Sequence, residues 1–364
     1  MYSLPQSYNQ TSKCKRCISS NAYAFMIMTE NNYRPVDTRY EAGMKYRRAG
    51  HSGILLPEIS LGLWHNFGDV DTLSESRRKL HHAFDCGITH FDLANNYGPS
   101  PGSAEETFGY VMKHSFASYR DELFISTKAG HDMWPGPYGT WGSRKSLMAS
   151  LDQSLRRMNL DYVDIFYSHR FDPYTPLEET MQTLVDIVRQ GKALYVGISK
   201  YPLEEAQKAY DYLKSHDVHC LLYQGRYNLL DRKVEETGIL KQAAENGTGF
   251  IAFSPLAQGL LSGRYLDGIP ATSRIARGGF LKQEALTEDV MHKVRALNEV
   301  ARRRGQTLAE MALAWLLKDD LVTSVIVGVS SVEQLDDNFK ALRNTAFSVE
   351  EQDEIEKILT SVAK

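Results

Sequence analysis

Four side chains with complementary proton chemistry occur in this 364-residue chain, at the ends of three successive strand-like segments. Asp92 and Tyr97 lie in HFDLANNYG (90–98), Lys128 ends the run ISTK, and His169 follows YVDIFYS. A tyrosine phenol has an ordinary pKa of about 10, so it is a weak proton donor at neutral pH. A lysine ammonium group held beside it by an aspartate would stabilise the phenolate and make the phenol more acidic.

A histidine beside such a phenol can donate a hydrogen bond to a substrate oxygen. The set would then protonate a carbonyl oxygen while that oxygen becomes an alkoxide. The hydride must come from a bound cofactor, because the protein supplies only the acid and the geometry. Each residue also has a purely structural interpretation, as a helix cap, a solvated lysine or a core histidine. Their joint occurrence predicts carbonyl reduction by this catalytic set: Asp92, Tyr97, Lys128 and His169.

Alternating strand-like and helix-like segments must position these groups. Parallel strands need a crossover, usually a helix, so the alternation predicts a parallel sheet. Eight strands favour a closed (β/α)8 TIM barrel over an open sheet. The predicted strands are residues 58–63, 89–93, 122–127, 162–168, 193–199, 220–224, 249–254 and 324–328. Helical patterns between them include residues 74–87, 143–160, 176–192 and 202–216.

Further elements are predicted at the two ends of the barrel sequence. Two short runs within residues 44–62 flank a Gly-containing turn and indicate an N-terminal β-hairpin. Residues 311–320 have the apolar spacing of a helix packed on the barrel. Residues 348–359 begin with a serine three positions before a glutamate, which is typical of a capping box and predicts a final helix.

Composition narrows the classes of function and partner. The chain is 42% hydrophobic and 24% charged, and its net charge of -3 predicts no nucleic-acid partner. No apolar run approaches the roughly 18 residues that a membrane span needs, so a cytoplasmic protein is predicted. Four cysteines are too few for a disulfide scaffold. Cys14 and Cys17 form a C-x-x-C pair without a second ligand pair, so no metal site is predicted.

The first part of the chain differs from the rest. Residues 1–43 are rich in Ser, Asn, Thr and Tyr and hold basic residues before the first acid, Glu30. A disordered leader, an early start codon and a transit peptide all remain open for this segment. Residues 44–364 are predicted to form a single barrel domain.

Three motifs resemble those of the aldo-keto reductase family, and the resemblance runs from about Met44 to about Val362. They are GITHFDLANNYG (87–98), ISTKAG (125–130) and YSHR (167–170). The resemblance implies that Tyr97 is the proton donor, that Lys128 and Asp92 tune it, and that His169 orients the carbonyl. Residues 61–68, 95–106, 128–139 and 167–172 resemble the branch of L-glyceraldehyde 3-phosphate reductases and shaker-type potassium-channel β-subunits.

The family resemblance also implies NADP(H), bound in an extended form across the barrel rim. This agrees with the absence of a G-x-G-x-x-G motif after the first predicted strand. Many family members have basic residues in the adenosine segment, where this chain has serine and glutamine, so Arg264 or Arg274 is predicted to supply the charge. The predicted cofactor-binding residues are Trp64, Asp92, Ser199, Gln224, Ser254, Leu256, Gln258, Arg264, Arg274, Ser330, Gln334, Asp337 and Asn338.

A loop rich in aromatic residues, 131–144, follows the strand of Lys128 and is predicted to overhang the carbonyl pocket. An anionic substrate group would meet Arg144 or Arg170. The alternative is a surface loop whose aromatic residues pack locally. The predicted substrate-binding residues are Trp64, Trp134, Tyr138, Arg144 and Arg170.

The sequence thus predicts an NADPH-dependent reductase of small aldehydes such as glyceraldehyde 3-phosphate or methylglyoxal. One alternative is a barrel aldolase that uses Lys128 as a Schiff-base nucleophile. Another is a non-catalytic barrel that senses the cofactor as a partner of a membrane channel. The resemblance further implies a homo-oligomer, a tetramer or larger.

Overall fold

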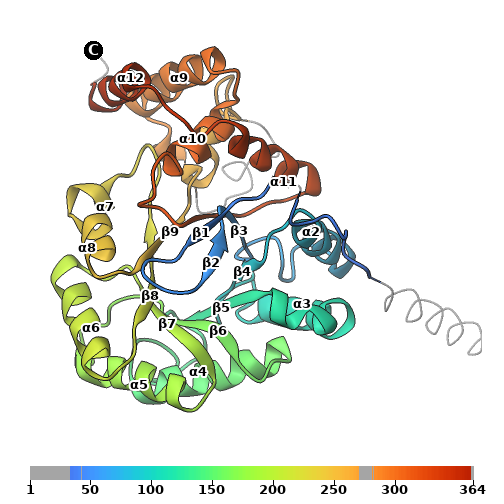
Figure 1. Cartoon of the computed structure of the whole chain (residues 1–364), viewed down its shortest axis with the longest axis vertical. Coiled ribbons are helices and arrows are strands. Elements are labelled where there is room, and N and C mark those ends of the chain that lie inside the picture. Colours follow the sequence, from blue (N-terminus) through green and yellow to red (C-terminus); the bar gives the residue numbers. More distant parts are fainter. Residues whose placement is uncertain (1–32, 42, 270–280, 282, 362–364) are drawn as a thin grey trace, which may run out of the picture.

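The computed structural model describes residues 33–41, 43–269, 281 and 283–361. Eight parallel strands close into a barrel in the order β10-β3-β4-β5-β6-β7-β8-β9, with helices around it (Figure 1). This confirms the predicted (β/α)8 barrel. The strands are β3 (Ile59–Gly62), β4 (His90–Asp92), β5 (Phe124–Ala129), β6 (Val163–Ser168), β7 (Ala193–Ser199), β8 (Cys220–Arg226), β9 (Gly249–Phe253) and β10 (Ser324–Val327).

Helices cover the outside of the barrel, and those predicted from periodicity lie within about four residues of the expected bounds. The helices before β10 are α2 (Leu73–Asp85), α3 (Ser103–Val111), α4 (Arg144–Met158), α5 (Leu177–Arg189), α6 (Leu203–Ser215), α7 (Lys233–Glu236), α8 (Ile239–Glu245), α9 (Glu288–Arg303) and α10 (Leu308–Leu316). After β10 come α11 (Val332–Phe339) and α12 (Val349–Thr360). The capping box of the last helix is present, since Ser348 accepts from the amide of Glu351 and Glu351 reaches back. No helix of the described ranges is long and apolar enough to cross a membrane.

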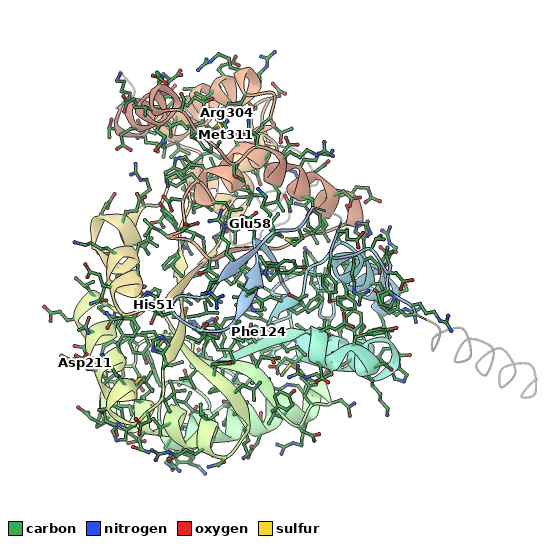
Figure 2. All side chains as sticks on the ribbon, in the orientation of Figure 1. His51, Glu58, Phe124, Asp211, Arg304 and Met311 are labelled. Atoms are coloured by element: carbon green, nitrogen blue, oxygen red, sulfur yellow. The ribbon has the colours of Figure 1, made fainter. Side chains whose placement is uncertain are left out.

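The predicted hairpin, β1 (Tyr46–Arg48) and β2 (Leu55–Pro57), lies across the N-terminal end of the barrel (Figures 1 and 2). Arg47 forms an ion pair of 2.8 Å with Glu58, just before β3. The hairpin turn touches the segment before β9: Gly50 has a φ of 54°, and a Cβ there would lie 1.9 Å from the Gly247 carbonyl oxygen. Only glycine fits this approach, so the turn seats the hairpin against the barrel.

Part of the predicted leader lies within the described residues. The ring of Tyr33 stacks on His81 of α2 at 3.8 Å, and its hydroxyl donates to Asp85 at 2.9 Å. Arg39 forms an ion pair with Glu122. Residues 33–41 therefore pack against the outside of the barrel, while Cys14 and Cys17 lie outside the described residues.

A chain of hydrogen bonds crosses the barrel interior below the C-terminal rim. His90 of β4 is fully buried, with Nδ1 2.8 Å from Ser60 Oγ and Nε2 3.1 Å from Ser126 Oγ. Ser126 Oγ donates to Asp92 at 2.8 Å. Burial lowers the pKa of His90 to about 4, so the imidazole is neutral.

A second buried network fixes α3 and α4 to β5. Glu105 of α3 accepts hydrogen bonds from Thr127 of β5 and, at 2.8 Å, from Arg157 of α4. Burial raises the pKa of the Glu105 carboxyl, and the Arg157 guanidinium opposes that rise. Thr127 precedes Lys128, and α3 follows the turn of Tyr97, so the network holds the two chain segments that carry these residues.

Replacing Arg157 by methionine should destabilise the protein strongly, because Glu105 would keep a buried and uncompensated charge. The expected loss is about 3–5 kcal/mol in the free energy of unfolding. Chemical denaturation followed by circular dichroism measures it. The matched control is Arg78→Met, which breaks an exposed pair with Glu75 and should leave the midpoint unchanged. Equal midpoints for the two variants would contradict a stabilising role of the network.

Stability should also fall in acid because of His90. Its folded pKa of about 4 lies below the ordinary value of 6.5, so the unfolded chain binds more protons between these pH values. The contribution of neutral His90 to the free energy of unfolding is fully present above pH 6.5. It is lost as the pH falls toward 4, and its size is on the order of 3 kcal/mol. His90→Gln should flatten the decline in urea denaturation, whereas exposed His292→Gln should not. A wild-type slope in His90→Gln would refute this assignment.

Candidate active site

The four predicted catalytic residues meet at the C-terminal rim of the barrel. Lys128 Nζ lies 2.7 Å from Asp92 Oδ2, donates to the Leu93 carbonyl at 2.6 Å, and lies 3.4 Å from the Tyr97 hydroxyl. The Tyr97 and His169 rings meet edge to face with their centroids 5.8 Å apart. Sequence reasoning placed these residues on neighbouring strand ends, and closure of β4, β5 and β6 brings their side chains into contact.

Asp92 is held on both carboxylate oxygens. Oδ2 accepts from Lys128, while Oδ1 accepts from Ser126 Oγ at 2.8 Å and from Gln224 Nε2 at 3.0 Å. Its side chain is only 3% exposed, and a carboxylate buried so deeply needs such partners. Gln224 comes from β8, across the barrel, so side chains of β5 and β8 fix the orientation of a carboxylate on β4.

The turn after β4 places Tyr97 over the lysine. The Asn95 amide donates to the Lys128 carbonyl at 2.9 Å, and the Tyr97 amide donates to the Ala94 carbonyl at 3.0 Å. Gly98 has a φ of 99°, and a Cβ there would lie 2.0 Å from Ser103 Oγ. The run LANNYG therefore leaves the strand as a tight turn that only glycine can complete.

The ionisation of Tyr97 differs from the sequence-based expectation. Burial and the Asp92 carboxylate raise the pKa of the Tyr97 phenol well above its ordinary value. The expectation treated Asp92 only as the group that holds the Lys128 ammonium group, but the carboxylate also cancels much of that positive charge and itself opposes ionisation of the phenol. The phenol is therefore neutral and holds its proton.

His169 is also neutral. Burial, together with the cations Lys200 and Lys128, lowers the pKa of its imidazole well below the ordinary value. Its Nδ1 atom is buried and has no hydrogen-bond partner among the described residues. The ring is therefore a neutral group with an unused polar atom beside the phenol.

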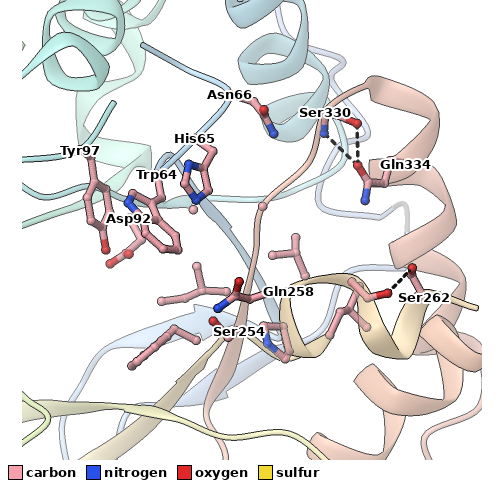
Figure 3. A pocket seen from close by; sticks show the side chains of 18 of the residues that line it. Trp64, His65, Asn66, Asp92, Tyr97, Ser254, Gln258, Ser262, Ser330 and Gln334 are labelled. Carbon is pink, nitrogen blue, oxygen red and sulfur yellow. Dashed lines mark hydrogen bonds between the residues drawn. The ribbon is translucent and has the colours of Figure 1, made fainter. Parts of the chain in front are cut away.

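A cavity of about 500 Å³ opens beside Asp92 and Tyr97 and continues between the loops that follow β3, β9 and β10 (Figure 3). Such a volume suits an extended small-molecule ligand. Eight of the predicted cofactor-binding residues line it: Trp64, Asp92, Ser254, Leu256, Gln258, Arg264, Ser330 and Gln334. Figure 3 shows Trp64 and Tyr97 at one end and Ser330 with Gln334 at the other.

The other predicted cofactor-binding residues lie elsewhere. Ser199 and Gln224 are buried at the ends of their strands, and Ser199 Oγ has no hydrogen-bond partner within the described ranges. Asp337 pairs with Lys340 at 2.6 Å, and Asn338 is a buried residue of α11; neither lines the cavity. Arg274 lies outside the described residues.

The loop after β9 has a strained backbone where it borders the cavity. Ser254, Ala257 and Gln258 have φ values of 54°, 48° and 58°, which non-glycine residues rarely adopt. Strain of this kind persists only where the surrounding structure compensates, and it concentrates at ligand-binding loops. The sequence pattern FSPLAQG pointed to the loop but not to its conformation.

Sequence reasoning missed the support of the loop after β3. Lys79 of α2 is completely buried; its Nζ donates to the Asn66 carbonyl at 2.7 Å and forms an ion pair with Asp71. Asn66 and Asp71 line the cavity together with His65. A buried lysine cannot be recognised from a helical pattern alone, because the same spacing suits a solvated one.

The predicted substrate-binding residues, Trp64 apart, do not line this cavity. Arg144 forms an ion pair with Asp186 of α5, on the outside of the barrel. Arg170 lies over the ring of Trp141 at 3.7 Å and donates to the Gly130 carbonyl at 2.9 Å. Tyr138 is exposed, and Trp134 is half-buried within its own loop. The loop aromatics therefore pack in part against neighbouring residues outside the loop: Trp141 contacts Tyr174 and Arg170, and Tyr138 contacts Lys145.

Comparison with known proteins agrees with the fold. The model of the family described as "Aldo/keto reductase family" matches residues 58–360. L-glyceraldehyde 3-phosphate reductase of Escherichia coli (strain K12) is 58% identical over 318 residues, covering 86% of this chain and 92% of that protein. A probable voltage-gated potassium channel subunit beta of Oryza sativa subsp. japonica is 35% identical over 305 residues, covering 82% and 91%. The chain therefore belongs to the aldo/keto reductase family, as its motifs predicted.

Proposed function

We propose that this chain reduces small aldehydes to alcohols with NADPH, with Tyr97 as the proton donor. The observation that carries the proposal is the position of Lys128 Nζ, 2.7 Å from Asp92 and 3.4 Å from the Tyr97 hydroxyl, at one end of the cavity. A buried, charge-paired lysine that contacts a phenol beside a cavity is a candidate catalytic group.

The cavity, together with an unpaired polar atom outside its lining, fits a nicotinamide dinucleotide. Ser199 Oγ is buried without a partner near Gln224, which suits a carboxamide that would bind at the bottom of the rim. Arg264 is exposed at the cavity and has no carboxylate partner within the described ranges, which suits a phosphate. When bound, the cofactor would supply the hydride.

The residues of this chain would donate the proton and stabilise the charges that form. The neutral phenol of Tyr97 would donate its proton as the carbonyl oxygen gains negative charge, since an alkoxide is far more basic than a phenolate. The ammonium group of Lys128 lies 4.8 Å from the ring centroid and would stabilise the phenolate as it forms. Neutral His169 would donate a hydrogen bond to the same oxygen and orient it.

The E. coli relative is named for L-glyceraldehyde 3-phosphate, and we include this phosphorylated aldehyde among the proposed substrates. Arg144 is unsuited to meet the phosphate, because Asp186 already neutralises it outside the barrel. Lys200, after β7, is better suited: its Nζ lies 3.0 Å from Nε2 of His131, and no carboxylate of the described residues pairs with it. Burial and nearby cations lower the pKa of Lys200 to about 8, a cost that an anionic substrate would offset.

Two alternatives receive less support. A Schiff-base aldolase needs a free amine, but Lys128 is fully buried and donates to Asp92 and to Leu93. A non-catalytic role beside a channel is suggested by the name of the rice relative. The intact set of Asp92, Tyr97, Lys128 and His169 favours turnover. Homo-oligomeric assembly and a cytoplasmic location remain predictions from the sequence.

Replacing Tyr97 by phenylalanine should lower kcat by about 10²–10⁴-fold, because general acid catalysis contributes that much. NADPH binding, measured by quenching of intrinsic fluorescence, should change little, because the ring is retained. Turnover is followed by NADPH absorbance with glyceraldehyde 3-phosphate and methylglyoxal. Tyr212→Phe on α6 is the control, since its hydroxyl donates to Gln182 of α5 on the outside of the barrel. A Tyr97→Phe enzyme with wild-type kcat would refute Tyr97 as the donor.

Replacing Arg264 by alanine should weaken NADPH binding by roughly 10–100-fold, the value of a charge-assisted hydrogen bond. NADH, which lacks the 2′-phosphate, serves as the internal control and should bind with nearly unchanged affinity. Fluorescence titration gives both dissociation constants. An equal loss for the two nucleotides would show that Arg264 does not contact the 2′-phosphate.

A further inference from the structure

Three side chains with different metal-binding atoms converge on the outside of the barrel, away from the candidate active site. His82 and Cys86 lie at the end of α2, and Asp336 lies on α11. The two helices are neighbours in Figure 1. His82 Nε2 is 2.6 Å from Asp336 Oδ1 and 3.6 Å from Cys86 Sγ, and all three ligand atoms lie within 4.8 Å of one another.

The spacing on α2 directs two ligands to the same place. Residues four apart on a helix lie on one face, so the imidazole and the thiol project side by side. One nitrogen, Nε2 of His82, faces both the thiol and the carboxylate, so the three groups surround a common point. Asp336 is 254 positions from His82 in the sequence, and only closure of the barrel brings it there.

The distances suit a tetrahedral cation. Bonds of about 2.3 Å to sulfur and about 2.0–2.1 Å to nitrogen at a tetrahedral angle separate the two ligand atoms by about 3.5–3.6 Å. The Sγ–Nε2 distance is 3.6 Å, so Cys86 and His82 already have the separation that two ligands of a tetrahedral ion need. His82 and Asp336, now joined by a hydrogen bond of 2.6 Å, would have to part by less than about 1 Å to admit the ion.

The cluster is also accessible. The side chains of His82 and Asp336 are 30% and 50% exposed, which leaves room for a water molecule as the fourth ligand. Burial and the carboxylates of Asp336 and Asp85 raise the pKa of the Cys86 thiol to about 11, so a cation must displace its proton. Thiolate and imidazole together select a borderline-soft divalent ion rather than Mg²⁺ or Ca²⁺.

We propose that His82, Cys86 and Asp336 bind a divalent transition-metal ion of the Zn²⁺ class, which joins α2 to α11. The ion would link two helices that flank the cavity. Lys79 of α2 supports the loop after β3, and Gln334 of α11 lines the cavity and accepts a hydrogen bond from Ser330. The site lies outside the reacting groups, so the proposal does not depend on the proposed reaction.

The test is a titration of the full-length chain with Co²⁺, whose absorption spectrum reports thiolate ligation and tetrahedral geometry. Cys14→Ser and Cys17→Ser are introduced first, so that the tail cysteines cannot contribute. We expect one equivalent of Co²⁺ to bind with a thiolate charge-transfer band, and one equivalent of Zn²⁺ to abolish that band. In this background Cys86→Ser should lose the band and bind Co²⁺ more than about tenfold more weakly. Removing even a residue that hydrogen-bonds to a metal ligand lowers metal affinity by about tenfold or more.

Asp336→Asn provides the matched comparison, because Asp337→Asn makes the same change one position along α11. Asp337 pairs with Lys340 and lies outside the cluster. Asp336→Asn should weaken Co²⁺ binding more than about tenfold, whereas Asp337→Asn should change it by no more than about twofold. Equal binding by these two variants, or a charge-transfer band that persists in Cys86→Ser, would overturn the proposal. If Cys86→Ser does not fold, the comparison between the exposed Asp336→Asn and Asp337→Asn variants still tests the metal site.

Discussion

The buried ion pair between Lys128 and Asp92 is the interaction on which the candidate active site depends. Removing two charges from water is costly, and their attraction offsets the cost only when every remaining donor and acceptor is satisfied. Here the Leu93 carbonyl, Ser126 and Gln224 complete the pair. These partners come from the turn after β4, from β5 and from β8, so the pair is stable only inside a closed barrel.

The surroundings of the pair set the protonation of the other groups. Because Asp92 neutralises Lys128, the phenol of Tyr97 experiences burial more than positive charge and keeps its proton. His169 is kept neutral by the same burial and by the cations around it. The site thus holds two neutral groups, Tyr97 and His169, beside an ion pair whose charges cancel. These groups change charge only when charge develops on the reacting oxygen.

The helices outside the barrel take part in the same organisation. Glu105 and Arg157 tie α3 and α4 to the strand of Lys128, and Lys79 ties α2 to the loop after β3. α11 borders the other end of the cavity through Gln334. The cluster of His82, Cys86 and Asp336 therefore joins two helices that both shape the cavity.

Much of this protein was predictable from local patterns, because strand periodicity, helix caps and motif order are properties of neighbouring residues. The barrel, its hairpin and the set of Asp92, Tyr97, Lys128 and His169 were predicted in this way. The direction of the Tyr97 pKa, the outward position of Arg144 and the metal-ligand cluster were not. Each depends on groups brought together across the barrel, and charge, burial and pairing are set by those distant neighbours, which only the tertiary structure supplies.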